Sequence, residues 1–435
     1  MTLDVVILAA GQGTRMKSRL PKVLHLLAGR PLVQYSIDAV SPLVAQPPVL
    51  VIGHGSDAVR QTVGNAARYA LQDDQLGTAH AVSQAQSLLQ GKGATTVLVM
   101  YADMPLLRPE TLKLLVDAHQ EQAATLSLLT MISDRPRGFG RIIRDTKDAI
   151  AAVVEDAQAT PDQKAIRELN VGVYCIDSGW LWDHLDKVPV SPQGEYYLTD
   201  LVEMAVSEGQ LIHAIRLDDP AEALGINTRV HLAEAESALR QRTNRDLMLS
   251  GVSLVDPATT YIHPTVRIGF DTIIEPNTHI YGQTSIGEGC HIGPHAVIED
   301  ATLEDNVYVG PFAHLRRGAY LESGVHMGNF GEIKNSRLRQ GVRMGHFSYI
   351  GDGDIGENTN IGAGTITCNY DGKNKHKTVI GKNVFIGSDT MLVAPVTLGD
   401  GSRTGAGSVV TRDVPPGGLV YGVPARPPVT HKKET

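Results

Sequence analysis

The sequence has few cysteines and no long apolar run, and each shortage excludes a class of protein. Its three cysteines, Cys175, Cys290 and Cys368, are too far apart for a zinc or disulfide-exchange motif. An odd, sparse set of cysteines is typical of a reducing compartment, so we predict a cytoplasmic protein without disulfide bonds. No segment approaches the roughly 20 apolar residues of a membrane span, and the first apolar run, Val5–Ala10, is too short for a signal peptide.

The sequence also has fewer basic than acidic residues, with 39 Lys and Arg and 47 Asp and Glu, which gives a formal net charge of −8. This balance argues against nonspecific binding to nucleic acid, and it provides no polybasic surface for a membrane. A small anionic substrate remains compatible with it, because a few local Lys and Arg side chains can bind phosphate. Glycine, in contrast, is plentiful at 44 of 435 residues. This composition indicates a repeat rather than one large α/β core.

The second half repeats an aliphatic residue at every sixth position. The spacing holds over Ile262–Ile292, resumes after one-residue slips at Leu303, Leu338 and Ile355, and returns at Ile380 after a longer break. A period of six fits neither an amphipathic helix nor an alternating strand, and it is typical of a parallel β-helix built from hexapeptides. The aliphatic residue then points into a narrow interior, and Gly or Asn forms the corner.

One segment, from Ile366 to Val379, breaks the period with the string ITCNYDGKNKHKTV. A loop that interrupts a solenoid is often where function lies, although a tolerated surface insertion is the alternative. Four histidines near the start of the repeat, His263, His279, His291 and His295, follow no metal motif, and we interpret them as solvated faces.

The first half has the pattern of an α/β domain. Four short apolar runs predict buried parallel strands: Val5–Ala9, Val49–Ile52, Val97–Met100 and Leu126–Thr130. Helical patterns alternate with them: Leu32–Val40, Ala79–Leu89 and Pro109–Glu121. This order predicts a mostly parallel sheet covered on both sides. The segment Arg229–Leu249 predicts a long helix that serves as a plain spacer, which divides the chain into domains at 1–228 and 251–435 with a linker at 229–250.

A glycine-containing turn follows the first predicted strand, in the string VVILAAGQGTRM. Gly11 and Gly13 would let backbone N–H groups approach phosphate oxygens, and a helix start after them would favour negative charge. Arg15 and Lys22 add positive charge. A tight strand-to-helix turn is the alternative, since the third glycine of the dinucleotide fingerprint is missing.

The complete strings around this turn are more specific evidence of function than its two glycines alone. LAAGQGTRM followed by LPKVL resembles the nucleotidyltransferases that join a sugar 1-phosphate to a nucleoside triphosphate. With LQDDQLGTAHA, MYADMPLL, GFGRI, LNVGVY, GEYYLTD and GINTR, and with FAHLRRGA, GNFGEIKNS, GHFSYIGD, NIGAGTITCNYDG and VFIGSDT in the second half, the chain resembles bifunctional N-acetylglucosamine-1-phosphate uridyltransferase/glucosamine-1-phosphate acetyltransferases of bacterial cell-wall synthesis. The resemblance covers residues 5–414, and it implies a Rossmann-like nucleotidyltransferase domain followed by a left-handed parallel β-helix.

For the first domain, the resemblance implies UTP and an amino-sugar phosphate as substrates and Mg²⁺ as the cofactor. The implied contacts to the nucleotide and to N-acetylglucosamine are Leu8, Ala9, Ala10, Gly11, Lys22, Gln72, Gly77, Thr78, Tyr101, Asp103, Gly140, Glu155, Asn170 and Asn227. Asp103 and Asn227 match the metal ligands, and oxygen ligands of this kind suit Mg²⁺. Asp103 also follows a buried strand, where open α/β sheets place their ligands.

For the second domain, the resemblance implies acetyl transfer from acetyl-CoA, with active sites between the subunits of a homotrimer. His346 matches the general base, and an imidazole of near-neutral pKa suits a base that takes a proton from an amine. The implied contacts to glucosamine 1-phosphate are Arg316, Lys334, Tyr349 and Asn360. Those to acetyl-CoA are Ala363, Asn369, Tyr370, Ser388 and Ala406.

The chain departs from the family pattern at four strings. The family's Asn-Thr-Gly is Asn170-Val171-Gly172 here, and its Asn-Asn-Arg is Asn227-Thr228-Arg229. Its Arg-Pro-Gly is Arg316-Arg317-Gly318, and its Arg-Val-Pro is Gly422-Val423-Pro424, with Arg426 beyond. The last change removes an arginine expected near the CoA phosphate.

Two other functions are weighed against the bifunctional one. The first is a nucleotidyltransferase for another sugar phosphate whose β-helix serves oligomerisation or regulation. The second treats the β-helix as a trimerisation scaffold or binding module. His346, Lys334, Tyr349 and the NYDG string favour two activities, because a structural tail has no reason to keep them together.

Overall fold

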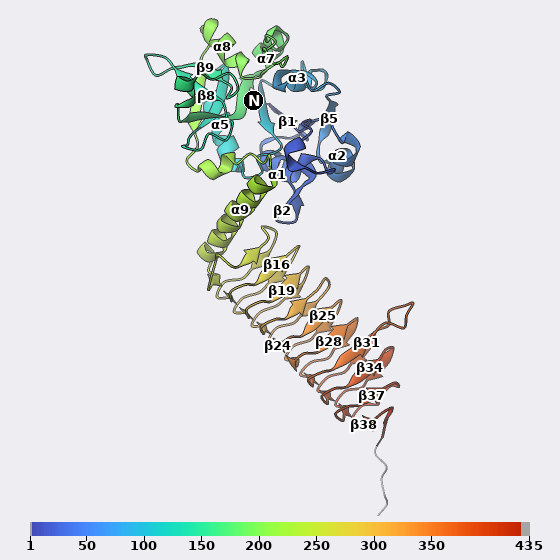
Figure 1. Ribbon diagram of the computed structural model, residues 1–435. Coiled ribbons are helices and arrows are strands. Elements are labelled where there is room, and N and C mark those ends of the chain that lie inside the picture. Colours follow the sequence, from blue (N-terminus) through green and yellow to red (C-terminus); the bar gives the residue numbers. More distant parts are fainter. Residues whose placement is uncertain (1, 428–435) are drawn as a thin grey trace, which may run out of the picture. The chain divides into compact units, whose positions relative to one another are not determined.

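The computed structural model describes residues 2–427, which divide into two compact units at the boundary between Ala238 and Leu239. Figure 1 shows the first unit as a sheet with helices on both sides and the second as a stack of short strands. Among the described residues, no helix combines the length and the apolarity that a membrane crossing requires.

The first unit is built on a nine-stranded sheet. Seven strands form its main path in the order β11-β7-β10-β6-β1-β4-β5: β1 (Leu3–Leu8), β4 (Val49–Ile52), β5 (Arg68–Leu71), β6 (Thr96–Tyr101), β7 (Leu126–Ile132), β10 (Glu168–Asp177) and β11 (Ile212–Arg216). All neighbours on this path are parallel except β10, which runs antiparallel to β6 and β7. The hairpin of β8 (Arg141–Arg144) and β9 (Ile150–Val154) pairs with β10, and β2 (Leu26–Leu27) pairs with β3 (Arg30–Pro31). The mostly parallel sheet is therefore confirmed.

Helices bury both faces of this sheet. One face packs against α1 (Leu32–Val40), α2 (Ser56–Val63) and α5 (Pro109–Glu121), and the other against α3 (Thr78–Ser83), α4 (Gln86–Leu89), α7 (Ser178–His184) and α8 (Asp200–Ser207). Because side chains alternate along a strand, Val5 and Ile7 join the first core while Val6 and Leu8 join the second. The single helix predicted over 79–89 is wrong, since α3 and α4 are separate. A short α6 (Pro161–Lys164) precedes β10.

Helix α9 (Arg229–Leu249) has contacts at both of its ends. The backbone N–H of Ala28 donates to Glu236 at 2.9 Å, within the first unit. Within the second unit, Asn244 Nδ2 donates to the carbonyl oxygens of Pro257 and Thr260 at 2.8 and 2.9 Å. These buried contacts give α9 more than the role of a plain spacer.

The second unit consists of three parallel sheets, as the hexapeptide period predicts. The first sheet contains β12 (Ser253–Leu254), β15 (Ile273–Ile274), β18 (His291–Ile292), β21 (Tyr308–Val309), β24 (His326–Asn329), β27 (Arg343–His346), β30 (Asn360–Ile361), β33 (Phe385–Ile386), β36 (Arg403–Thr404), β38 (Leu419–Gly422) and, antiparallel at its end, β39 (Ala425–Arg426). The second contains β13 (Tyr261–Ile262), β16 (His279–Tyr281), β19 (Val297–Glu299), β22 (His314–Leu315), β25 (Glu332–Lys334), β28 (Tyr349–Gly351), β31 (Ile366–Cys368), β34 (Met391–Val393) and β37 (Val409–Val410). The third contains β14 (Arg267–Ile268), β17 (Ser285–Ile286), β20 (Thr302–Leu303), β23 (Tyr320–Leu321), β26 (Arg337–Leu338), β29 (Gly353–Ile355), β32 (Thr378–Ile380) and β35 (Val396–Leu398).

The one-residue slips of the repeat all fall at the corner between the second and third sheets. Asp300, Asn335 and Asp352 form these shortened corners, with positive φ of 47°, 46° and 54°. The interrupting loop, Asn369–Lys377, leaves the coil at the same corner, between β31 and β32, and Figure 1 shows it projecting from the strands. We call this edge, from Asp300 to the loop, the loop corner.

Candidate active sites

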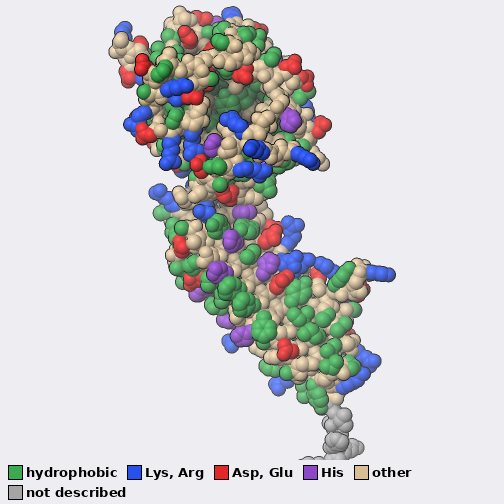
Figure 2. All heavy atoms as spheres, viewed as in Figure 1, with side chains coloured by type: hydrophobic (Ala, Val, Ile, Leu, Met, Phe, Trp, Pro, Cys, Tyr) green, Lys and Arg blue, Asp and Glu red, His purple; other side chains and the backbone are tan. Residues whose placement is uncertain are grey.

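Two adjoining cavities open in the first unit near the carboxyl ends of β1, β5 and β6, and Figure 2 shows a hollow with Lys and Arg side chains at its rim. The first cavity, of about 290 Å³, is lined by ten predicted residues: Leu8, Ala9, Ala10, Gly11, Lys22, Gln72, Gly77, Thr78, Tyr101 and Asp103. The second, of about 180 Å³, is lined by the others, together with two that it shares: Tyr101, Asp103, Gly140, Glu155, Asn170 and Asn227. The structure thus brings every predicted residue of this domain to one continuous site.

Lys22 lies against both predicted metal ligands. Its Nζ donates to Asp103 Oδ2 at 2.5 Å and to Asn227 Oδ1 at 3.1 Å. Arg15 donates to the same Asn227 oxygen at 3.0 Å. A carboxylate oxygen and an amide oxygen therefore already converge on positive charge, and this donor set fits a hard divalent cation.

The glycine turn after β1 differs from the prediction of a helix start at the phosphates. It continues into a 3₁₀ turn, Thr14–Met16, and the next α-helix of the chain begins only at Leu32, so no α-helix starts directly after the two glycines. The helix N-terminus at the cavity is that of α3, whose N-cap Gly77 and first residue Thr78 line it. Gly13 has φ 62°, and a Cβ there would come within 2.6 Å of Lys22 Cβ. Gly13 therefore makes room for Lys22, whereas Gly11 has open space at its Cβ position and lines the cavity.

Two distant strings form one wall of the first cavity. Gly77 has φ 106°, and a Cβ there would come within 2.6 Å of Tyr196 N. Thr78 Oγ1 accepts a hydrogen bond from Leu198 N at 2.9 Å, and Ala79 N donates to Tyr196 O at 2.9 Å. Backbone contact this close requires glycine, which explains why LGTAHA and GEYYLTD occur together.

A β-bulge positions Asn170 in the second cavity. The pairing of β10 with β7 shifts between Asn170 and Tyr174. Asn170 Nδ2 donates to Tyr174 Oη at 2.6 Å, and its Oδ1 accepts from Gly172 N at 3.1 Å. Gly172 has φ 82°, and a Cβ there would come within 2.6 Å of the Tyr101 ring. Val171 is buried in the core, so this departure from the family string leaves Asn170 in place.

Gly172→Ala is expected to lower pyrophosphate release by about 100-fold, because the new Cβ displaces Tyr101, which lines both cavities. Acetyl transfer should stay unchanged. Gly209→Ala is the matched control, since Gly209 also has positive φ but open space at its Cβ position. Equal losses in both variants would assign the effect to backbone strain alone.

Carboxyl groups cluster beside the second cavity. Glu155 Oε1 accepts from the Thr199 hydroxyl at 2.9 Å, and burial raises the pKa of Glu155. Burial, followed by the charges of Glu155 and Glu203, raises the pKa of Asp200 to about 6. A partly buried carboxyl group of this kind can hydrogen-bond the hydroxyls of a sugar.

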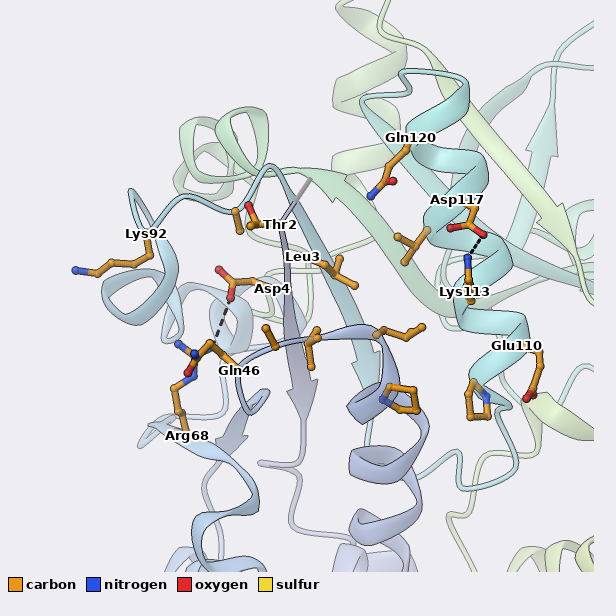
Figure 3. Close-up of a pocket in the computed structure, with 17 residues that line it drawn as sticks. Thr2, Leu3, Asp4, Gln46, Arg68, Lys92, Glu110, Lys113, Asp117 and Gln120 are labelled. Carbon is orange, nitrogen blue, oxygen red and sulfur yellow. Dashed lines mark hydrogen bonds and ion pairs between the residues drawn. The ribbon is translucent and has the colours of Figure 1, made fainter.

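A larger cavity, of about 690 Å³, lies elsewhere in the first unit, beside the starts of β1 and β5 (Figure 3). None of the predicted residues lines it. Four of its charged side chains are already paired, because Arg68 contacts Asp4 at 3.4 Å and Lys113 contacts Asp117 at 2.5 Å. It is therefore separate from the site described above.

In the second unit, Tyr349 and Asn369 converge above Gly351. A Cβ on Gly351 would contact the Tyr349 hydroxyl and come within 2.7 Å of Asn369 Nδ2. Asn369 is buried and donates to Asp352 at 2.6 Å. Lys334 is the register neighbour of Gly351 in the adjacent strand. A phenol, an amide and an ammonium group thus meet near the loop corner.

Cations gather at the same place. The neighbouring Lys375, followed by Arg316, lowers the pKa of Lys334. Arg316 Nη1 donates to Glu332 at 2.8 Å. Lys375 lies on the interrupting loop and was not among the predicted residues, although the basic composition of the loop could have indicated it. Clustered cations of this kind suit a phosphate group.

His346 ends β27 of the first sheet, at the corner between the first and second sheets. Its Nδ1 is 2.9 Å from Asn329 Oδ1, one coil earlier in register. Because an amide oxygen can only accept, Nδ1 carries the proton in this contact and Nε2 keeps its lone pair. Asn329 was not predicted, and the paired strings GNF and GHF are the only signal in the sequence.

The residues predicted for acetyl-CoA fall into two groups. Ala363, Ser388 and Ala406 continue the column that begins with Asn329 and His346, and we call these five residues the histidine edge. Asp389 N donates to Ala363 O at 2.6 Å and Gly407 N donates to Ser388 O at 2.8 Å, so successive coils stack directly. A Cβ on Gly387 would lie 2.7 Å from Ala406 N, so glycine keeps this edge narrow. Asn369 and Tyr370 lie instead at the loop corner.

The interrupting loop is held by its own contacts. The backbones of Tyr370 and Lys375 form an isolated antiparallel β-bridge, and Tyr370 Oη donates to Gly372 O at 2.7 Å. Asp371 accepts from the backbone N–H groups of Lys373 and Asn374, and with His376 these contacts lower its pKa. The loop thus has a defined conformation.

Asn360 is separated from the other predicted sugar contacts. It begins β30 in the first sheet, where its register neighbours are Arg343 and Phe385. Arg316, Lys334 and Tyr349 belong to the second sheet and its loop corner. One chain therefore spreads the predicted acetyltransferase residues over two faces.

The departures from the family strings have local explanations. Thr228 Oγ1 accepts from His231 N at 3.2 Å, at the start of α9. Arg317 replaces the family's proline and donates to Asp300 through Nε and Nη2 at 3.0 and 2.9 Å. Arg426 faces Tyr421 across the terminal β38–β39 pair.

The four histidines at the start of the β-helix pack against aromatic rings, so the prediction of solvated faces is incomplete. His279 stacks on Tyr261 with centroids 4.7 Å apart, and His295 stacks on Phe312 at 4.8 Å. Figure 2 shows histidines along this unit. Within residues 2–427, no group of three or more His, Cys, Asp or Glu side chains is arranged to hold a metal ion.

A nucleotide-sized cavity at the strand ends of one unit, and a hexapeptide β-helix carrying a histidine in the other, define a nucleotidyltransferase joined to a hexapeptide acyltransferase. Residues 5–170 match the MobA-like NTP transferase domain family. Residues 265–300 and 377–412 match the bacterial transferase hexapeptide (six repeats) family, which agrees with a left-handed β-helix.

The chain is 48% identical over 431 residues to the bifunctional protein GlmU of Heliobacterium modesticaldum, covering 95% of this chain and 94% of that protein. It is 47% identical over 434 residues to the bifunctional protein GlmU of Pelobacter propionicus, with coverage of 95% and 94%. The chain belongs to the GlmU family and is a bifunctional uridyltransferase and glucosamine-1-phosphate acetyltransferase. The relatives favour this interpretation over a single-activity enzyme with a structural tail.

Proposed function

We propose that the second unit acetylates glucosamine 1-phosphate with acetyl-CoA, and that the first unit then transfers uridylyl from UTP to N-acetylglucosamine 1-phosphate and releases pyrophosphate. The observation that carries the proposal is the convergence of the predicted residues on the two joined cavities, with Tyr101 and Asp103 shared between them. A nucleotide in the first cavity and a sugar phosphate in the second would meet at these shared residues.

In uridylyl transfer, an oxygen of the sugar phosphate attacks the α-phosphorus of UTP, and pyrophosphate leaves. Asp103 and Asn227 would hold Mg²⁺, which supplies positive charge to the triphosphate when bound. Lys22, whose ammonium contacts both ligands, turns to the phosphates. Glu155 and Asn170 orient the sugar in the second cavity. The reaction depends on positioning and charge rather than on a covalent intermediate.

In acetyl transfer, the amine of the sugar attacks the thioester carbonyl, the C–S bond breaks, and the CoA thiolate leaves. His346 Nε2 takes the proton that the amine nitrogen loses, while the contact with Asn329 keeps Nδ1 protonated and the ring oriented. Lys334 and Arg316 bind the phosphate of the sugar, and Tyr349 and Asn369 its hydroxyls. The pantetheine chain follows Ala363, Ser388 and Ala406 along the histidine edge.

We infer a homotrimer, because one chain spreads its acetyltransferase residues over two faces. An exposed aromatic column of Phe312, Phe330 and Phe347 runs beside the histidine edge, and the first two rings stack with centroids 5.0 Å apart. Such a column is costly in water and is covered when a second β-helix packs against it.

Free cysteines support a reducing, cytoplasmic location.

Light scattering of the purified chain is expected to give three times the monomer mass of 46.7 kDa. Phe330→Asp should shift the species towards the monomer and lower acetyl transfer, because it places charge in the aromatic column. Pyrophosphate release should persist. A monomer in the wild type with full acetyl transfer would contradict the shared site.

A panel of sugar phosphates tests the substrates. Pyrophosphate should appear with N-acetylglucosamine 1-phosphate and UTP, and free CoA thiol with glucosamine 1-phosphate and acetyl-CoA. Glucose 1-phosphate should give little of either product. Preference for glucose 1-phosphate, or absence of CoA release, would contradict the proposal.

A further inference from the structure

The first cavity has a charged end and a neutral end. Lys22 and Asp103 lie near the end of β6, whereas Gln72 directly follows β5 at the edge of the sheet, with the backbone of Leu8–Gly11 between them. If UTP occupies the cavity, as proposed above, its phosphates face Lys22 and its base faces Gln72. The inference below rests on that proposed function.

The side-chain amide of Gln72 is fixed in one orientation. Gln72 is buried, and its Nε2 lies 3.1 Å from Gly77 O and 3.0 Å from His80 Nδ1. A backbone carbonyl can only accept, so the atom facing Gly77 O must be the nitrogen. Both amide hydrogens are then used, and Oε1 remains as an acceptor for a ligand in the cavity.

This arrangement requires a lone pair on His80 Nδ1, so the ring proton belongs on Nε2. The Gln84 amide lies 3.2 Å from Nε2. The Gln84 amide does not need a lone pair on Nε2, because His80 O and Ser83 Oγ, each 3.1 Å away, can accept both of its hydrogens. His80 therefore serves as the second acceptor that holds the Gln72 amide in place.

We propose that His80 is a positioning residue that sets nucleobase specificity: by accepting a hydrogen bond from Gln72 Nε2, it presents Gln72 Oε1 to the base and selects uracil over cytosine. Uracil carries a hydrogen on N3 and can donate to Oε1. Cytosine has a lone pair on N3, so the same pose would bring two acceptors together in a buried site. An unpaired buried acceptor is penalised far more than a hydrogen bond is rewarded.

The test compares His80→Leu with His80→Asn in the full-length protein. Asn can place a carbonyl oxygen near the position of Nδ1, whereas Leu offers no acceptor. With N-acetylglucosamine 1-phosphate as co-substrate, we expect His80→Leu to reduce the UTP/CTP ratio of kcat/KM by about tenfold, the worth of one hydrogen bond. His80→Asn should keep the ratio near the wild-type value. The ratio of the dissociation constants of UTP and CTP, measured without the sugar, should change in parallel.

Gln84→Leu is the control, since it removes the contact to the other ring nitrogen and should leave the ratio unchanged. A structural role for His80 would instead lower kcat/KM equally for UTP and CTP. That result, or the same loss of selectivity in His80→Asn as in His80→Leu, would overturn the proposal. If the wild type released no pyrophosphate from UTP, the proposed function itself would fail, which is a distinguishable outcome.

Discussion

Asp103→Ala should lower pyrophosphate release on the order of 10³-fold, while acetyl transfer from acetyl-CoA continues at the wild-type rate. Asp103 lines both cavities of the first unit and accepts from Lys22 at 2.5 Å, so its loss removes the carboxylate that would hold the divalent cation at the reacting phosphates. Acetyl transfer should survive because the His346 site belongs to a separate compact unit.

Two further variants and one binding measurement sharpen this experiment. Asp103→Asn keeps an oxygen ligand without the charge, and it should lose less activity than Asp103→Ala. Asp183→Ala removes an exposed carboxylate of the same unit, and it should leave both rates unchanged. Binding of Mn²⁺ with UTP, followed by electron paramagnetic resonance, should weaken in parallel with the rate. Loss of both activities in a folded Asp103→Ala protein would refute the separation of the two sites.

His346→Ala is expected to reduce acetyl transfer by about 10²- to 10⁴-fold, the usual contribution of a general base. Uridylyl transfer from UTP to N-acetylglucosamine 1-phosphate should stay intact. The geometric reason is the contact between His346 Nδ1 and Asn329 Oδ1, which leaves Nε2 able to accept a proton. Free CoA thiol and pyrophosphate, measured on one preparation, give both rates.

The competing interpretation treats His346 as a corner residue that stabilises the coil. In that case the alanine variant would acetylate at nearly the wild-type rate but melt at a lower temperature. His295→Ala is the matched control, because His295 occupies the same edge of the β-helix at an earlier coil and stacks on Phe312. It should affect melting more than acetyl transfer, and a fall in acetyl transfer as large as that in His346→Ala would contradict the assignment.

Local sequence predicted the elements whose signals are complete within a short window. The helices at Leu32–Val40 and Pro109–Glu121 have the predicted bounds, and the hexapeptide period gave the β-helix without any long-range information. The helix predicted over 79–89 failed because Gln84 and Ala85 leave the helix between α3 and α4, although the apolar pattern continues through them.

The rest of the sites depends on contacts between residues far apart in the chain. Gly172 is required because the ring of Tyr101 packs against it, and Gly13 is required because Lys22 packs against it. Neither contact can be read from the sequence. The sequence alone does not point to His80, because its partner Gln72 comes from another element. Single-sequence reasoning identifies residue types with suitable chemistry, but it does not show which hydrogens and lone pairs they have left to offer.

The loop corner illustrates the same limit. The slips in the repeat were visible in the sequence, but their meeting at one edge was not, since each slip is an isolated deviation of one residue. In the structure, Asn335 and Asp352 lie on the edge from which the loop departs, and Asn335 Nδ2 donates to Asp352 at 2.6 Å. This edge therefore places Lys375 beside Lys334.

The most direct test of the two-activity account is a single reaction with glucosamine 1-phosphate, acetyl-CoA, UTP and Mg²⁺, in which free CoA thiol and pyrophosphate are followed together. Both products should accumulate in equal amounts after a short lag in pyrophosphate, and omission of acetyl-CoA should abolish pyrophosphate release. Mixing the Asp103→Ala and His346→Ala proteins should restore the two-step reaction, because each protein retains the activity that the other lacks. Pyrophosphate release at full rate without acetyl-CoA would contradict the account.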